Sequence, residues 1–107
     1  MSEKRIQQIE QRIDRIKKAL SHVGPMRPGL LTRQYKNRKN EAGGYWQISY
    51  TRRMKSRTEY VREECTAEIR RQIATHKRFK QLVEQWIDLS IEHSQLTMRA
   101  EEPAMTR

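Results

Sequence analysis

Residues 45–61, YWQISYTRRMKSRTEYV, decide the fold of this chain. In 45–51 and again in 56–61, aromatic and β-branched residues alternate with polar ones, and this period of two is typical of β-strands. The basic run Arg52-Arg53-Met54-Lys55 between them predicts a tight connection of two antiparallel strands. The first strand would then have two faces, one with Trp46, Ile48 and Tyr50 and the other with Tyr45, Gln47, Ser49 and Thr51.

A further strand is predicted over residues 30–36, LLTRQYK, which show the same alternation after the turn pair Pro28-Gly29. A long polar loop, KNRKNEAGG, would connect it to the strand over 45–51, with Gly43-Gly44 closing the loop. Residues 27–61 are therefore expected to form a basic three-stranded antiparallel meander.

A helix is predicted over residues 1–24, because its apolar residues recur with alternating spacings of three and four. This pattern is typical of the seam along which one helix packs on another. Gly24-Pro25 would end the helix, since Gly supplies a left-handed cap and Pro cannot continue it. The seam consists of Ile6, Ile9, Ile13, Ile16, Leu20 and Val23.

A long helix is predicted over residues 62–100, followed by a frayed tail at 103–107. The expected fold class is α+β: an N-terminal helix, a three-stranded antiparallel meander and a long C-terminal helix that pairs with the first, in one domain of residues 1–102. One stripe of the long helix consists of Phe79, Leu82, Trp86, Leu89 and Leu96, and Val83, Ile87 and Ile91 widen it over most of the circumference.

The apolar seams leave two hypotheses for what covers them. The first helix and the last 22 residues of the long helix are each about 30 Å long, so the two helices could pair within one chain. That pairing leaves apolar surface on the long helix, which favours a homodimer or a larger protein complex. The residues expected at this partner interface are Ile6, Ile9, Ile13, Ile16, Leu82, Trp86 and Leu89.

The composition limits the classes of protein. The chain has 107 residues, which suffice for one modest core. No apolar run approaches the roughly 20 residues that span a bilayer, and the first residues are too charged for a secretory signal. Cys65 is the only cysteine, which excludes an intramolecular disulfide. A cytoplasmic location without membrane contact is expected.

The positive charge is concentrated in the middle of the chain. Residues 27–57 hold nine basic side chains and one acidic one, so eight of the ten net charges lie there. Such a concentration predicts a polyanionic partner, with nucleic acid as the first hypothesis. An acidic protein surface, or a solvated face without a partner, are the alternatives. The expected nucleic-acid contacts, with DNA ahead of RNA, are Arg33, Lys36, Arg38, Lys39, Tyr45, Arg52, Arg53, Lys55 and Arg57.

The aromatic residues among these bases have two interpretations. They could stack on unpaired bases, as aromatic residues on sheets do, or they could form the core between the sheet and the long helix. The core is favoured for Trp46 and Tyr50. Tyr45 lies on the opposite strand face and is the candidate for exposure.

No catalytic or metal site is expected. His22, His76 and His93 lack the spacing of metal ligands, both with one another and with Cys65. The chain has no glycine-rich phosphate loop, and nothing would supply an oxyanion hole for a cysteine nucleophile. The protein is therefore predicted to be non-catalytic, with no cofactor and no small-molecule substrate.

Motifs spread over residues 24–96 carry a resemblance to a known family. They are GPMRPG at 24–29, RQY at 33–35, GYW at 44–46, KSRTEYV at 55–61, IRRQIATHKRFK at 69–80 and WIDLS at 86–90. This pattern resembles an uncharacterised family of small prokaryotic proteins, domain of unknown function 6788. The resemblance implies no particular activity. Members often carry a cysteine cluster in the loop after the first strand, but residues 36–44 hold no cysteine or histidine, so a metal is not expected here.

Three interpretations of function remain. The first is a non-catalytic nucleic-acid-binding protein that acts beside a larger nucleic-acid enzyme such as a transposase. The second is a helical adaptor or scaffold subunit whose helices bind a protein partner. The third is a regulator of a toxin or phage system, which the sequence does not separate from the first. Salt distinguishes the first two, because phosphate contacts weaken as salt rises and apolar helix contacts do not.

Overall fold

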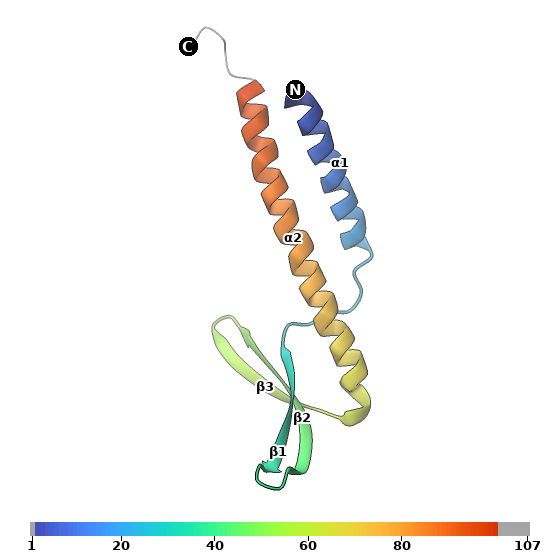
Figure 1. Cartoon of the computed structure of the whole chain (residues 1–107), viewed down its shortest axis with the longest axis vertical. Coiled ribbons are helices and arrows are strands. Elements are labelled where there is room, and N and C mark those ends of the chain that lie inside the picture. Colours follow the sequence, from blue (N-terminus) through green and yellow to red (C-terminus); the bar gives the residue numbers. More distant parts are fainter. Residues whose placement is uncertain (1, 101–107) are drawn as a thin grey trace. The chain divides into compact units, whose positions relative to one another are not determined.

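The computed structural model describes residues 2–100 and shows an α+β fold (Figure 1). The elements in chain order are α1 (Ser2–Ser21), β1 (Leu30–Asn37), β2 (Ala42–Arg52), β3 (Lys55–Val61), a short 3-10 helix (Glu63–Cys65) and α2 (Thr66–Ala100). This order, with α2 contacting α1, confirms the predicted fold class. The tail predicted at 103–107 lies outside the described residues.

The described residues divide into two compact units. The helical unit consists of residues 2–23 and 79–100, and the sheet unit consists of residues 24–78. α2 contributes residues to both units. A single domain over residues 1–102 stays a prediction. No helix within residues 2–100 is long and apolar enough to cross a membrane.

The helical unit is an antiparallel pair of helices with an apolar seam between them (Figure 1). Its core consists of Ile9 and Ile16 from α1 with Leu82 and Leu89 from α2, and these side chains are at most 7 % exposed. The alternating spacing of three and four places them on one side of each helix, which is why the helices pack along this line. The side chains packed around this core are Ile13, Ala19, Leu20, Trp86 and Leu96.

Polar side chains join the two helices beside this core. The Arg5 guanidinium donates to both carboxylate oxygens of Glu92, at 2.7 and 2.9 Å, and this bond holds the pKa of Glu92 below its ordinary value. Nε2 of His93 lies 3.0 Å from a carboxylate oxygen of Glu10. Early residues of α1 thus meet late residues of α2, which fixes the antiparallel register.

Four residues expected at a partner interface are already buried within one chain. Ile9, Ile16, Leu82 and Leu89 form the core of the helical unit, so a dimer through these four would require the helix pair to open. The other three residues of that expected interface are half-buried: Ile6, Ile13 and Trp86.

The sheet unit is built around β2, with β1 and β3 antiparallel on its two sides. Ile48 lies opposite Leu31 of β1 and Glu59 of β3. Residues directly opposite one another share a face of a sheet. We name the face with Trp46, Ile48 and Tyr50 the covered face, and the face with Tyr45, Gln47 and Ser49 the open face.

The strands of this sheet are longer than the sequence predicts. β1 and β2 are joined by only four residues, 38–41, so the predicted long loop over 36–44 is wrong. Gly43 and Gly44 belong to β2, and side chains of β1 lie beside both glycines. A Cβ on Gly43 would lie 3.1 Å from the stem of Lys36, and a Cβ on Gly44 would lie 2.7 Å from the Arg33 guanidinium.

Ile48 is the centre of the sheet unit and is fully buried. The segment before β1 covers it: a Cβ on Gly29 would lie only 2.7 Å from two side-chain carbons of Ile48. Gly29 also has a φ of 144°, which glycine adopts readily and other residues do not. Val61, at 6 % exposed, is the second buried apolar side chain of the described sheet unit.

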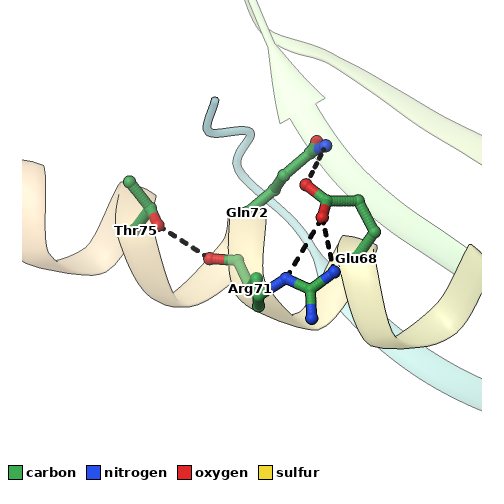
Figure 2. A network of polar contacts seen from close by, with 4 residues as sticks. All are labelled: Glu68, Arg71, Gln72 and Thr75. Atoms are coloured by element: carbon green, nitrogen blue, oxygen red, sulfur yellow. Dashed lines mark hydrogen bonds and ion pairs between the residues drawn. The ribbon is translucent and has the colours of Figure 1, made fainter. Parts of the chain in front are cut away.

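The segment before β1 is also tied to the first turns of α2. The backbone N–H of Arg27 donates to the carbonyl of Gln72 at 3.2 Å. Beside this bond, the Glu68 carboxylate accepts hydrogen bonds from Gln72 and Arg71, and the Thr75 hydroxyl donates to the carbonyl of Arg71 (Figure 2). The bonds from Gln72 and Arg71 hold the pKa of Glu68 below its ordinary value. This carboxylate is thus satisfied within α2.

Candidate nucleic-acid interface

Seven basic side chains gather at the two hairpin turns of the sheet. The turns lie at opposite ends of the sheet, because β2 runs from one to the other (Figure 1). At about 3.3 Å per residue, β2 separates them by at most roughly 33 Å. We name as the first tip the bases Lys36, Arg38 and Lys39, and as the second tip the bases Arg52, Arg53, Lys55 and Arg57.

The first tip surrounds the turn between β1 and β2. Oδ1 of Asn37 accepts hydrogen bonds from the backbone N–H groups of Lys39 and Asn40, at 3.1 and 3.4 Å, as asparagine commonly does in turns. The stem of Lys36 lies close to Gly43. The backbone and one asparagine therefore shape the turn, and its three bases are exposed.

The second tip is a two-stranded ribbon. β1 begins opposite Ser49, so the last three residues of β2 pair with β3 alone. Arg53 and Met54 connect the strands with φ values of 52° and 65°, and a two-residue type I′ turn requires positive values at both positions. Residues 51–57 are all exposed. Three residue pairs make this ribbon about 10 Å long.

The seven tip bases keep their charge exposed. Within residues 2–100, no carboxylate lies within 4.0 Å of any of them, although other bases in the same part of the chain do form ion pairs. A cationic cluster that its own fold does not neutralise attracts anions from solution. The arrangement can therefore bind closely spaced phosphates.

Arg33, which is also a predicted nucleic-acid contact, is exposed but has partners within the sheet unit. Its guanidinium lies 3.5 Å from the carboxylate of Glu63. It also lies 5.7 Å from the ring centre of Tyr35 and 5.3 Å from that of Trp46, within cation–π range. These contacts hold the side chain on the covered face.

Trp46 is half-buried among polar groups of the same unit. Its indole N–H donates to the carboxylate of Glu63, and Arg70 of α2 lies 5.0 Å from its ring centre. With Arg33 also near the ring, guanidinium groups occupy the positions where a base would stack.

Arg27, Tyr50 and Glu59 form a second polar group on the covered face. The Tyr50 hydroxyl donates to Glu59 at 2.6 Å, and the Arg27 guanidinium donates to the same oxygen at 3.0 Å. The bond from Tyr50, followed by that from Arg27, holds the pKa of Glu59 below its ordinary value, and the bond to Glu59 raises the pKa of Tyr50. The positive charge of Arg57 lowers the pKa of Glu59 further without forming an ion pair.

The open face carries hydroxyl and amide side chains together with two tyrosines. Tyr45 is half-buried and Tyr60 is 69 % exposed. Together with Lys36, Gly43 and Gly44, they line a hollow of about 510 Å³. Two aromatic rings beside a lysine can stack an unpaired base and hold its phosphate.

Tyr60 is one residue that the sequence analysis missed. It lies opposite Gln47 in the β2–β3 register. The signal was available, because the alternation that places Tyr45 and Gln47 on one face also places Tyr60 there once the hairpin register is known.

The remaining candidates for chemistry lie apart. Within residues 2–100, no group of three or more His, Cys, Asp or Glu side chains could hold a metal ion. Cys65 is a half-buried thiol at the end of the 3-10 helix.

Comparisons with known proteins give no relative: no family model, curated protein or solved structure matches this chain. The resemblance to domain of unknown function 6788 therefore remains a prediction from the motifs. What the two tips do has to follow from their own geometry and charge.

Proposed function

We propose that this protein is a non-catalytic nucleic-acid-binding protein that contacts DNA with the two tips of its sheet. The observation that carries the proposal is the set of seven exposed tip bases that no carboxylate of residues 2–100 neutralises. Phosphates of nucleic acid are closely spaced anions, and neutralising them releases counterions. A cytoplasmic location and a role beside a larger nucleic-acid enzyme belong to the same proposal.

The charge balance of the two units supports this function. Residues 24–78 hold 14 basic and 5 acidic side chains, a net charge of +9. The rest of the chain holds 9 basic and 8 acidic side chains, a net charge of +1. The excess charge thus belongs to the unit that carries the tips, which is typical of an electrostatic footprint for nucleic acid.

The spacing of the tips favours duplex DNA. One helical turn of DNA is about 34 Å long, close to the roughly 33 Å that β2 places between the tips. Two tips at this spacing could therefore contact two separate groups of phosphates on one duplex. Duplex RNA fits less well, because its major groove is deep and narrow.

Salt dependence tests the proposal. Binding of a labelled 16-base-pair duplex would be measured by fluorescence anisotropy between 50 and 300 mM salt. Seven phosphate contacts predict that log affinity falls against log salt with a slope of about −6. Two triple variants should each make this slope less negative by about 3. They are Lys36→Ala/Arg38→Ala/Lys39→Ala and Arg52→Ala/Arg53→Ala/Lys55→Ala.

A matched control variant tests whether the slope depends on the position of the bases or only on the net charge of the protein. Lys4→Ala/Arg12→Ala/Arg15→Ala removes three exposed bases from α1 and should leave the slope unchanged. If both tip variants bind with the affinity and slope of the parent while keeping its circular dichroism spectrum, the proposal is wrong. An RNA hairpin of equal length tests the nucleic acid, since tighter binding to it would replace DNA by RNA.

A helical adaptor is a second candidate because α2 keeps apolar side chains exposed on the helical unit. Ile87, Ile91 and Met98 are 47, 52 and 63 % exposed. With Val83 and Trp86 they line a mostly apolar groove of about 530 Å³. A protein helix, or the same helix of a second copy, would bury this surface.

The adaptor hypothesis is tested by changing only residues that line this groove. Ile87→Ser/Ile91→Ser should abolish a protein complex or a dimer seen by sedimentation and leave DNA binding unchanged. A salt-resistant complex that this variant destroys would favour the adaptor. If the parent protein stays monomeric and forms no protein complex, the adaptor hypothesis is wrong.

A further inference from the structure

Met54 lies at the end of the second tip, and its side chain is 97 % exposed. No other large apolar side chain within residues 2–100 is as exposed. Such a residue contributes almost no apolar burial to its own fold. Its sequence neighbours are the bases Arg53 and Lys55, so the apolar side chain lies inside the cationic tip.

The backbone at this position favours other residues. Arg53 and Met54 both have positive φ values, which an Asn-Gly pair adopts more easily than residues with a long side chain. Neither burial nor turn geometry therefore accounts for a methionine at this position. An interaction with something outside the chain would account for it.

We propose that Met54 is a wedge that enters between two stacked base pairs of duplex DNA and kinks the duplex. This inference rests on the proposed function and specifies its substrate as duplex DNA that the protein bends. Apolar side chains act in this way from the minor groove, where they open one base step while nearby cations hold the phosphates. Methionine suits the role because its unbranched thioether adapts to an irregular gap.

The length of the ribbon fits such an insertion. The ribbon is about 10 Å long beyond β1, and the minor groove is about 7.5 Å deep. Met54 at its end could therefore reach the base edges. The minor groove of straight B-DNA is about 6 Å wide, so the ribbon enters as the kink toward the major groove opens the minor groove. The exposure of residues 51–57 is consistent with this, because no other described segment covers them.

The charges beside Met54 lie on one face of the ribbon. Arg52 and Lys55 lie opposite each other in the register, one on each strand of the ribbon. Directly opposite residues share a face of a sheet, so these two bases can hold the phosphates along one side of a groove. Arg57, two residues further along β3, adds a third positive charge near the same end.

DNA bending tests the wedge directly. A 20-base-pair duplex with a fluorescent donor and acceptor at its ends would be saturated with the full-length protein, and the bend would be measured by energy transfer. The parent should bend the duplex by about 20–90°. Met54→Gly keeps all seven tip bases and gives the turn a residue that favours positive φ, so it should bind with at most a few-fold loss but without a bend. Met54→Leu keeps an apolar side chain and should bend the duplex as the parent does.

A mismatched duplex gives a second measurement that a purely structural role would not change. One mismatched pair is already partly unstacked, so opening that step costs less free energy. The parent should therefore prefer the mismatched duplex over the paired one by roughly tenfold. Met54→Gly should bind both duplexes equally.

Each outcome decides the inference. If Met54→Gly bends DNA as much as the parent, or if the parent binds without bending, the wedge is wrong and DNA binding by the tips stands. If the parent fails to bind any duplex at low salt, the wedge is lost together with the proposed function. Loss of bending in Met54→Gly, with bending kept in Met54→Leu, supports it.

Discussion

The interactions that stabilise the helical unit differ from those that stabilise the sheet unit. The helical unit buries four apolar side chains in one seam, and its ion pair Arg5–Glu92 joins the two helices. The sheet unit buries two apolar side chains, Ile48 and Val61, and carries most of the positive charge. In the first unit, charged side chains help the helices to pair. In the second, most bases are left exposed toward whatever lies outside the chain.

The carboxylates of the sheet unit explain which of its bases are exposed. Glu59 and Glu63 lie at the covered face and bind Arg27 and Arg33 there. Glu68 is bound within α2. The acids thus stabilise the side of the sheet that packs internally, and the tips keep a net positive charge.

The largest expected effect comes from the buried isoleucines. Ile48→Ala in the sheet unit and Ile9→Ala in the helical unit should each cost about 2–5 kcal/mol of unfolding free energy, because each leaves a cavity in a small core. Amide hydrogen exchange should accelerate in β1 to β3 for the first variant and in α1 for the second. Leu30→Ala, at a 65 % exposed position, is the control and should change little. Equal acceleration along the whole chain in both variants would contradict two separate cores.

The next effect comes from the backbone over Ile48. Gly29→Ala places a Cβ 2.7 Å from Ile48 at a φ of 144°, so we expect a loss of about 1–3 kcal/mol in unfolding free energy. Gly24→Ala is the matched control, because nothing lies within 4 Å of a Cβ at that position. Thermal unfolding of both variants would check this, and equal stability would show that the contact over Ile48 is not required.

A smaller effect is expected from salt. Repulsion among the tip bases destabilises the sheet unit at low ionic strength, and salt screens it. Raising salt from about 20 to about 500 mM should therefore stabilise the sheet unit by roughly 1 kcal/mol. The helical unit should gain nothing, since salt weakens its ion pair. Hydrogen exchange at the two salt concentrations would show which unit is stabilised. Slower exchange confined to α1 at high salt would contradict this prediction.

The smallest effect concerns the Glu59 carboxylate. Its pKa is lower in the folded protein than the ordinary value of 4.5, so the unfolded chain takes up a proton first as the pH falls. The stability that Glu59 contributes is thus complete above about pH 4.5 and is lost as the pH falls through its folded pKa. Tyr50→Phe removes the main cause, so the pKa of Glu59 should rise toward 4.5 and this acid loss should shrink. An NMR titration of the carboxyl group measures it, and an unchanged pKa would show that Arg27 alone holds Glu59.

Much of the fold could be predicted because the spacing of apolar residues changes clearly along the chain. A spacing of three and four over residues 6–23 and alternation in residues 45–61 each fit one kind of element. The turn between β1 and β2 could not be predicted, because Gly43-Gly44 is also a common loop signal. Its place in β2 depends on pairing with β1, where Gly44 lies opposite Tyr35.

The candidate site was predicted in part. The charge run identifies the tip bases, and the structure leaves them exposed. It could not show that Arg33 is engaged, because Glu63 is thirty residues away in sequence and meets it only in the folded sheet unit. Tyr60 and Met54 were missed for a related reason, since the register and the exposure of a turn residue depend on strand pairing.

By itself, the sequence determined the types of element, their order and the excess positive charge of the central segment, because these depend on local periodicity and on residue counts. The tertiary structure alone decided which bases the chain neutralises and which it leaves exposed, because an ion pair depends on distances of a few ångströms between residues far apart in the chain. It also decided that Ile9, Ile16, Leu82 and Leu89 cover one another within one chain. An apolar stripe specifies that a partner is needed, and only the packing of the folded chain shows which partner it has.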